Sequence, residues 1–144
     1  MKRFQLLPCL TLLLLVGCTS APEKPASGAS LPVCGLLPNC VNSESGEGGK
    51  AIDPIEATVA QWLQLKSWLS TREDWNIGKG TDDFLQAETM TPLMRFRDDV
   101  QLRYDHAAGL IHVRSSSRLG IGDMGANRRR VEMLRQLVSS ESVY

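Results

Sequence analysis

The chain has 144 residues, with 16 basic and 16 acidic side chains, so its formal charge is balanced. That length allows one domain with a modest core and is too short for two domains of ordinary size. A balanced charge gives no general electrostatic case for binding nucleic acid or an anionic membrane surface. The charge is unevenly placed, however, because nine of the eleven arginines lie from Arg95 onwards.

The N-terminus has the pattern of a secretory signal. Lys2 and Arg3 precede an apolar run that is too short to span a bilayer comfortably. The run ends in Leu-Val-Gly-Cys18, which resembles the bacterial lipobox, where the cysteine takes a diacylglycerol and becomes the first mature residue. We therefore expect residues 1–17 to be a lipoprotein signal peptide and Cys18 to be the lipidation site. The alternative is an ordinary secreted protein.

The segment after Cys18 is rich in Ala, Pro, Ser and Gly and cannot bury a core. We expect residues 18–31 to be a lipidated flexible tether and residues 32–144 to be a single domain. Thr19, rather than Asp, next to the cysteine resembles the sorting signal for the outer membrane. The predicted location is therefore the cell envelope, with the lipid in the outer membrane and the domain facing the periplasm.

Two cysteines, Cys34 and Cys40, remain in the mature domain after Cys18 has been lipidated. In an oxidising compartment the simplest prediction is a disulfide between them. Metal binding is the weaker interpretation, because two thiolates with no second Cys or His pair nearby would leave zinc short of its usual four ligands. We expect no metal and no cofactor.

The first helix is predicted to start at Asp53, with Pro54 at its first position and Glu56 completing a capping box. Apolar residues then recur at three- and four-residue steps over about four turns, which favours one buried stripe. The stripe consists of Ile55, Val59, Trp62, Leu65 and Leu69. The polar, glycine-rich stretch 42–50 before it is predicted to be a mobile surface loop.

Four strands are predicted next, over 75–77, 84–90, 94–104 and 110–115. The third alternates only if a bulge is placed at Asp98 and Asp99. A second helix is predicted to begin with Asn127 as its N-cap. The order helix, strands, helix predicts an α+β domain of about four antiparallel strands with two helices packed on one face.

The stretch 114–130 contains five arginines, three of them in the first turn of the last helix, where cations are disfavoured by about 0.3 to 1 kcal/mol each. The structural explanation is that Asp123, Glu88, Asp98 or Asp99 neutralises them, together with Glu132 one turn after Arg128. The functional explanation is an anion site at the helix start. Its candidate residues are Arg114, Ser115, Ser117, Arg118, Asp123, Asn127, Arg128 and Arg130, with Glu88, Asp98 and Asp99 as supporting acids.

Catalytic patterns are weak. Residues 120–125 match the G-x-G-x-x-G pattern, but too little chain follows for a second parallel strand, so dinucleotide binding is not predicted. His106 and His112 have no nucleophile at a recognisable spacing. No catalytic residue is assigned, although Asp98, Asp99 or Glu88 could act as a general acid or base beside the arginines.

One set of residues spread over almost all of the domain forms a longer pattern: Pro38, Asn39, Cys40, Glu88, Leu93, Arg95, Phe96, Asp98, Asp99, Val100, Val113, Arg114, Ser115, Ser117, Arg118, Gly120, Asp123, Gly125, Asn127, Arg128 and Arg130. This pattern resembles that of a bacterial and plastid family called domain of unknown function 1499. His-Ala-Glu, common in the family, is Gln86-Ala87-Glu88 here, so a role that needs that histidine would fail. The resemblance implies a shared fold and shared polar positions and no established activity.

Three hypotheses follow. The leading one is a non-catalytic envelope lipoprotein that acts as a binding or assembly module, with an arginine-rich cluster that could bind an anion. Its partners would be the membrane, through the lipid, and an envelope protein or a small anionic ligand, but no nucleic acid. The second is a hydrolase-like envelope enzyme, and the third is a purely structural arginine cluster.

Overall fold

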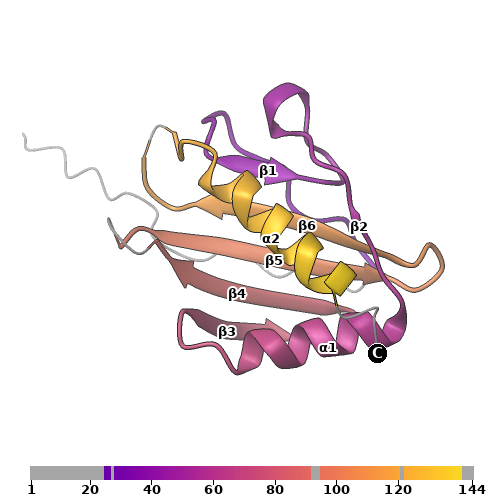
Figure 1. Ribbon diagram of the computed structural model, residues 1–144. Coiled ribbons are helices and arrows are strands. Elements are labelled where there is room, and N and C mark those ends of the chain that lie inside the picture. Colours follow the sequence, from indigo (N-terminus) through magenta and orange to yellow (C-terminus); the bar gives the residue numbers. More distant parts are fainter. Residues whose placement is uncertain (1–24, 27, 92–94, 121, 141–144) are drawn as a thin grey trace, which may run out of the picture.

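The computed structural model describes residues 25–26, 28–91, 95–120 and 122–140. These residues form an antiparallel sheet and two α-helices (Figure 1), which confirms the predicted α+β class. In chain order the elements are β1 (Cys40–Asn42), the 3₁₀ helix η1 (Gly48–Lys50), β2 (Ile55–Glu56), α1 (Val59–Ser70), β3 (Trp75–Gly80), β4 (Phe84–Met90), β5 (Arg97–Asp105), β6 (Leu110–Ser117) and α2 (Ala126–Ser140).

The sheet has six strands in the order β1-β6-β5-β4-β3, and β2 pairs with β6 outside this path. The four long strands, β3 to β6, are the four that the sequence predicts. The two additional strands are short and lie along the same edge of β6: β1 pairs with Arg114–Ser116 and β2 with Leu110–Ile111. Strands of two or three residues are too short to show an alternation in the sequence.

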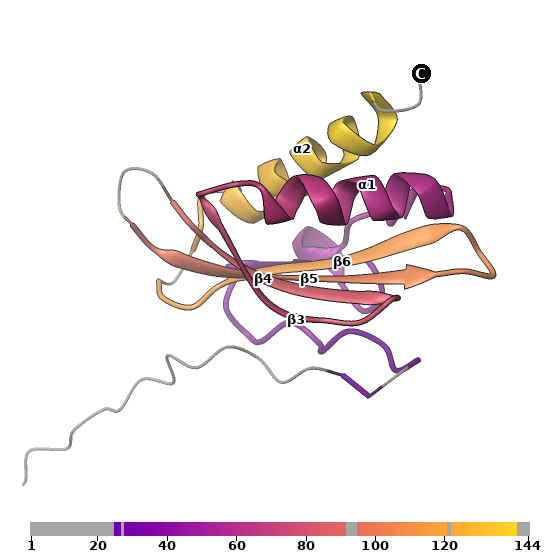
Figure 2. The ribbon, with the colours of Figure 1, turned by 90° about the horizontal axis from the view of Figure 1, so that it is seen from below.

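Both helices lie on one side of the sheet, as predicted (Figure 2). The core fills the space between the two layers, and it includes Trp62 and Leu69 from α1, Leu102 from β5 and Leu134 from α2. The chain from residue 28 to β1 runs along the opposite side of the sheet. That segment is attached to the sheet, because Leu31 is buried and Asn42 donates a hydrogen bond to the carbonyl of Pro32 (2.9 Å).

The predicted start of the first helix at Asp53 is wrong. Ile55 and Glu56 form β2, and α1 begins six residues after Asp53 with Thr58 as its N-cap. Thr58 and Gln61 form the capping box, so the helix signal lay slightly further along the chain. Ile55 is buried by pairing with Ile111 of β6 rather than by a helical stripe.

The predicted bulge in the third long strand is also wrong. β5 pairs with β4 and β6 in continuous register through Asp98 and Asp99. Asp98 therefore shares the helix-facing side of the sheet with Val100 and Leu102, and Asp99 points to the other side. Alternation along a strand normally places apolar residues on the side that faces the core. Asp98 can lie on that side because its carboxylate has a partner on α2.

The stretch 42–50, predicted to be a mobile surface loop, is tied to the sheet. Asn42 Oδ1 accepts hydrogen bonds from the amides of Glu44 (2.8 Å) and Ser45 (3.3 Å). Glu44 forms an ion pair with Arg103 of β5. Gly46 packs so closely on the backbone that an added Cβ would lie 2.3 Å from the carbonyl oxygen of Asn42.

Candidate functional site

On the helix side of the sheet, Arg130 from α2 reaches down to β5 and β6. Its guanidinium forms an ion pair with Asp98 and donates to Ser115 Oγ (2.9 Å) and Asn127 Oδ1 (2.7 Å). The Asp98 side chain is fully buried, and that of Arg130 is 10% exposed. Because both charges are desolvated, this pair is a structural cross-link between the sheet and α2.

Asn127 lies at the centre of the same network. Its Oδ1 accepts from Ser115 Oγ (2.6 Å), and its Nδ2 donates to Ser117 Oγ (3.0 Å), Asp123 Oδ2 (2.7 Å) and the carbonyl of Asn39 (3.0 Å). The predicted role of Asn127 as N-cap is therefore wrong. It is a buried residue inside α2 whose amide connects the helix, β6 and the segment before β1. We call Asp98, Ser115, Ser117, Asp123, Asn127 and Arg130 the helix-side network.

The start of α2 is occupied by a carboxylate of the protein itself. Asp123 accepts from the backbone amides of Gly125 (2.9 Å) and Asn127 (2.9 Å). Burial alone would raise the pKa of Asp123, but the hydrogen bonds from Asn127 and Gly125 outweigh it and hold that pKa below its usual value. Asp123 therefore satisfies two of the amides that the predicted anion site at the helix start would use, rather than binding an arginine.

Arg128 also differs from the prediction. Its Nη2 donates to the carbonyls of Gly49 and Ala51, both at 2.9 Å, and so joins the helix to the segment around η1. Glu132, one turn later, binds Arg135 instead (3.1 Å). Within the part of the chain that the structure describes, the cations of the first turn are compensated by carbonyl groups and Asp98 rather than by an acid on the helix itself.

A second set of charges lies on the opposite face of the sheet. Arg118 holds both oxygens of Asp99 in a bidentate pair (2.8 and 2.7 Å) and also binds Glu88 (2.7 Å). Hydrogen bonding to Asp99 raises the pKa of Arg118. Glu88 also lies 3.2 Å from the guanidinium of Arg97. We call Glu88, Asp99, Arg97, Arg114 and Arg118 the opposite-face cluster.

Arg114 is the most buried arginine of this cluster. Its Nη1 donates to Ser116 Oγ (2.8 Å) and lies 3.5 Å from Gln101 Oε1, while its Nε has no hydrogen-bond partner among the described residues. Burial lowers its pKa, and the charge of Asp99 acts in the opposite direction. Arg114 is thus held inside the domain by neutral partners and by the field of one carboxylate.

The predicted anion-binding residues therefore do not meet at one site. Ser115, Ser117, Asn127 and Arg130 belong to the helix-side network, whereas Arg114 and Arg118 lie on the opposite face of the sheet. Their alternation along β6 explains the separation, since neighbouring strand residues point to opposite faces. Glu88, Asp98 and Asp99 do lie beside arginines, as predicted, and each of them is paired.

The structure adds a site that the sequence did not single out. A cavity of about 320 Å³ opens where the β4–β5 loop meets the end of β6. We call it the loop-end cavity; its lining consists of Arg95, Phe96, Arg97, Arg118 and Leu119. Three arginines from two parts of the chain converge on it. Arg95, Phe96 and Arg118 are among the motif residues quoted for the family, and Arg118 is also a candidate anion-binding residue, but nothing in the sequence indicates that these residues line one cavity.

Hydrogen bonds to Thr91 fix the backbone of two residues that line this cavity. Its amide donates to the carbonyl of Phe96 (2.9 Å), and its hydroxyl and carbonyl accept from the amides of Phe96 (2.9 Å) and Arg95 (3.0 Å). Arg95 has a φ of 52°, in the left-handed region that non-glycine residues rarely adopt. Thr91 is thus joined to Arg95 and Phe96 by three hydrogen bonds, and the side chains of both residues are exposed.

Charge around the loop-end cavity is not balanced. Arg97 and Arg118 share the carboxylates of Glu88 and Asp99. Arg95 forms no ion pair and no side-chain hydrogen bond with any described residue. An anion entering the cavity would meet one unneutralised guanidinium and the exposed edge of Arg97, whose side chain is 58% exposed.

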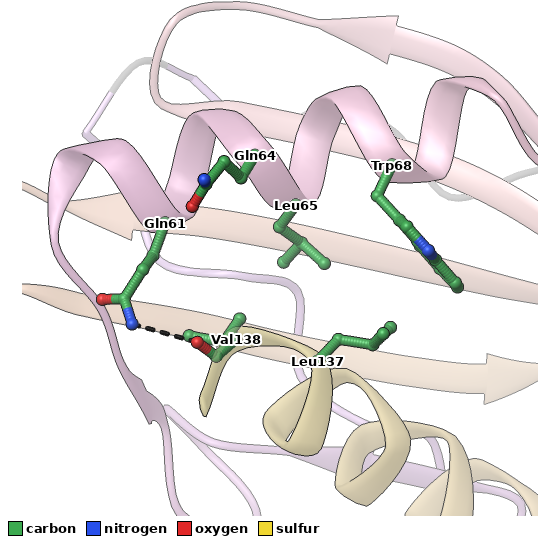
Figure 3. Close-up of a pocket in the computed structure, with 6 residues that line it drawn as sticks. All are labelled: Gln61, Gln64, Leu65, Trp68, Leu137 and Val138. Carbon is green, nitrogen blue, oxygen red and sulfur yellow. Dashed lines mark hydrogen bonds between the residues drawn. The ribbon is translucent and has the colours of Figure 1, made fainter. Parts of the chain in front are cut away.

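Two other hollows are less suited to a ligand. The one between α1 and α2 (Figure 3) has a volume of only about 10 Å³, about enough for one water molecule. Gln61 Nε2 donates to the carbonyl of Val138 (2.9 Å) across its end. A larger one of about 350 Å³, beside η1 and the start of α2, is lined by two acids, Glu47 and Asp123, and by Lys50 and Arg128.

Cys34 and Cys40 form the predicted disulfide. Lys50 Nζ donates to the carbonyls of Gly35 and Leu36 inside the loop that this bond closes. Among the described residues no group of three or more His, Cys, Asp or Glu side chains could hold a metal ion. None of the helices in that part of the chain is long and apolar enough to cross a bilayer. Cys18 lies outside the described residues.

These features define a small α+β domain in which arginine–carboxylate pairs hold both faces of an antiparallel sheet. The chain belongs to the family described as protein of unknown function DUF1499, whose model matches residues 30–138. This confirms the resemblance that the motifs indicate, although Leu93 lies outside the described residues. No curated protein and no solved structure matches the chain.

Proposed function

We propose that the protein is a lipid-anchored, non-catalytic binding module of the cell envelope that holds an anionic ligand in the loop-end cavity. One observation carries the proposal: Arg95, Arg97 and Arg118 converge on a cavity of about 320 Å³, and Arg95 has no carboxylate partner among the described residues. That volume lies at the lower end of the range for small-molecule sites. Guanidinium groups are the usual partners of carboxylates and phosphates.

The described part of the chain enters the domain at the end of the sheet away from the loop-end cavity. Gly28 and Ala29 lie beside Thr81 and Asp83 of the β3–β4 turn. That turn is at the end of the sheet where β5 finishes, because Phe84 pairs with Arg103. The loop-end cavity lies at the other end, where β5 begins with Arg97.

The enzyme hypothesis has weaker support from the same contacts. Both oxygens of Asp99 accept from Arg118 and its side chain is only 4% exposed, so it is poorly placed to take a proton from a substrate. Oδ1 of Asp98 has no hydrogen-bond partner among the described residues, but the side chain is fully buried, so a substrate cannot reach it. The third hypothesis, a purely structural arginine cluster, fits the helix-side network, and we restrict that hypothesis to this network.

Equilibrium dialysis of the processed protein against radiolabelled phosphate and sulfate tests the anion site. Phospholipid nanodiscs of zwitterionic lipid would carry the protein, and empty nanodiscs would be the blank. We expect Arg95→Gln to weaken binding about tenfold or more, because a hydrogen bond to a charged group contributes about 1.5–3 kcal/mol. Arg72→Gln is the matched control, since Arg72 is half-exposed at the end of α1 and pairs with Asp74. Equal binding by both variants would refute the site.

The anchor has its own test. We expect metabolic labelling with a radioactive fatty acid to mark the wild-type protein and not Cys18→Ala, and fractionation to place only the wild type in the outer membrane. A wild-type protein recovered without lipid in the soluble periplasmic fraction would leave the ordinary secreted alternative in place.

A further inference from the structure

The loop-end cavity has an apolar component that an inorganic anion would not use. Phe96 and Leu119 both line it, and their exposed fractions are 38% and 54%. Neither belongs to the hydrophobic core. Single exposed apolar side chains are ordinary on a protein surface, but here two large ones flank three arginines in one cavity.

Hydrogen bonds hold the backbone of Phe96 in position, although its ring does not pack in the core. Both its amide and its carbonyl are hydrogen-bonded to Thr91. Leu119 follows Arg118, whose side chain is bound to Asp99 and Glu88 and whose amide donates to the carbonyl of Arg97 (3.0 Å). The backbone that carries Phe96, and the Arg118 side chain before Leu119, are therefore held by hydrogen bonds before any ligand arrives, which lowers the entropic cost of binding.

The volume of the cavity limits the ligand. A cavity of about 320 Å³ lies at the lower end of the range for small-molecule sites. A phosphate or sulfate ion, with only five heavy atoms, would leave part of that space to water. A ligand with an anionic head and a short apolar tail would occupy more of it and cover both Phe96 and Leu119.

The charges around the cavity also limit the number of negative charges that the ligand can carry. Glu88 and Asp99 already offset much of the charge of Arg97 and Arg118. Arg95 is the one lining arginine without such a partner among the described residues. The cavity therefore suits a group with one or two negative charges and not a polyanion, whose further charges would meet the carboxylates of Glu88 and Asp99.

We propose that the ligand of the loop-end cavity is a small amphipathic anion, a carboxylate or phosphate ester carried on an apolar group of about six carbons. Its head binds the exposed donors of Arg95 and Arg97, and its apolar part covers Phe96 and Leu119. This inference rests on the proposed anion site and adds the class of ligand that the site takes.

The test compares ligands that differ only in the apolar part. The processed protein in zwitterionic nanodiscs would be dialysed against radiolabelled acetate and hexanoate, methyl phosphate and hexyl phosphate, and the neutral alcohol 1-hexanol. Hexanoate should bind at least about tenfold more tightly than acetate, since each fully buried methylene gives up to about fourfold (about 0.8 kcal/mol). The carboxylate and phosphate pairs distinguish the two head groups.

Substitutions locate the effect. The double variant Phe96→Ser/Leu119→Ser should reduce the advantage of hexanoate over acetate to less than about threefold. The control is Val59→Ser/Leu63→Ser, which removes two apolar side chains of similar exposure, 49% and 55%, on α1. Thermal unfolding followed by circular dichroism checks that both double variants are folded.

The outcomes separate the two proposals. Equal affinity for acetate and hexanoate, with both weakened by Arg95→Gln, would overturn the amphipathic ligand and keep the anion site. Hexanol binding as tightly as hexanoate would also overturn it, because the arginines would then contribute nothing. Anion binding that is absent, or indifferent to Arg95→Gln, would refute the anion site itself.

Discussion

Asp98 and Asp99 are neighbours in β5, yet each forms an ion pair with an arginine on a different face of the sheet. Asp98 binds Arg130 of α2 on the helix side, and Asp99 binds Arg118 on the opposite side. Continuous pairing of β5 with β4 and β6 fixes this arrangement, because successive strand residues point in opposite directions. The two carboxylates therefore contribute to different parts of the molecule.

Replacing Asp98 should be costly. Asp98→Ala leaves the Arg130 guanidinium buried without a carboxylate, and breaking a buried pair in this way costs about 3–5 kcal/mol. Asp99→Ala should cost less, because Arg118 keeps Glu88. Urea unfolding followed by circular dichroism measures both. Asp74→Ala is the control, since its pair with Arg72 is half-exposed and should contribute about 0–1 kcal/mol. Equal losses for Asp98→Ala and Asp74→Ala would contradict the cross-link.

Gly46 should not tolerate a side chain. A Cβ there would lie 2.3 Å from the carbonyl oxygen of Asn42 and 2.4 Å from that of Lys50, so the backbone would have to move. We expect Gly46→Ala to lower the free energy of unfolding by about 1–3 kcal/mol or more. Gly49→Ala is the matched control, because a Cβ at Gly49 meets nothing within 4 Å. Chemical denaturation of the two variants should show a loss only for Gly46→Ala.

Stability should fall in mild acid because of His112. Burial lowers the pKa of His112, an effect partly opposed by the charge of Glu44, whose Oε1 lies 3.9 Å from Nδ1; Arg103 and Asp105 also act on it. The folded protein thus favours the neutral imidazole. The contribution of the neutral His112 side chain to the free energy of unfolding is present above the unfolded pKa of about 6.5 and is lost as the pH falls below that value.

We therefore expect the free energy of unfolding of wild type to fall between pH 7 and pH 5 more steeply than that of His112→Gln. Denaturation at several pH values gives both slopes. His106→Gln is the comparison variant, because His106 is an exposed residue in the β5–β6 turn. Parallel slopes for wild type and His112→Gln would rule out this account.

Asp123 should stabilise the start of α2. Asp123→Ala removes acceptors for the amides of Gly125 and Asn127 and for the Asn127 side chain, so we expect a loss of about 1–2 kcal/mol at pH 7. Because the folded pKa of Asp123 is lowered, the contribution is present above the unfolded pKa of about 3.9 and disappears as the pH falls through the folded pKa. Wild type and variant should converge in stability in strong acid.

The sequence by itself determined those features that depend on local or pairwise rules. Strand-forming composition over 84–90 and alternation over 110–115 identified two of the long strands, and the apolar periodicity through Trp62, Leu65 and Leu69 identified the first helix, although not its start. Two cysteines left in the mature domain were enough to predict the disulfide between Cys34 and Cys40. The acids available elsewhere in the chain also predicted carboxylate partners for the arginines of the 114–130 stretch, and Arg118 and Arg130 have them.

Only the tertiary structure decided which groups meet. Whether residues 55–56 form a helix start or a strand depended on the open edge of β6, which no local pattern reveals. The partners of Arg118 and Arg130 depended on sheet register and helix placement, because the acids on β4 and β5 lie 19 to 32 residues away along the chain. The loop-end cavity likewise exists only where the loop holding Arg95 and Phe96 meets the end of β6. Contacts between distant segments are set by how all the elements pack together, and so they cannot be derived from any one of them.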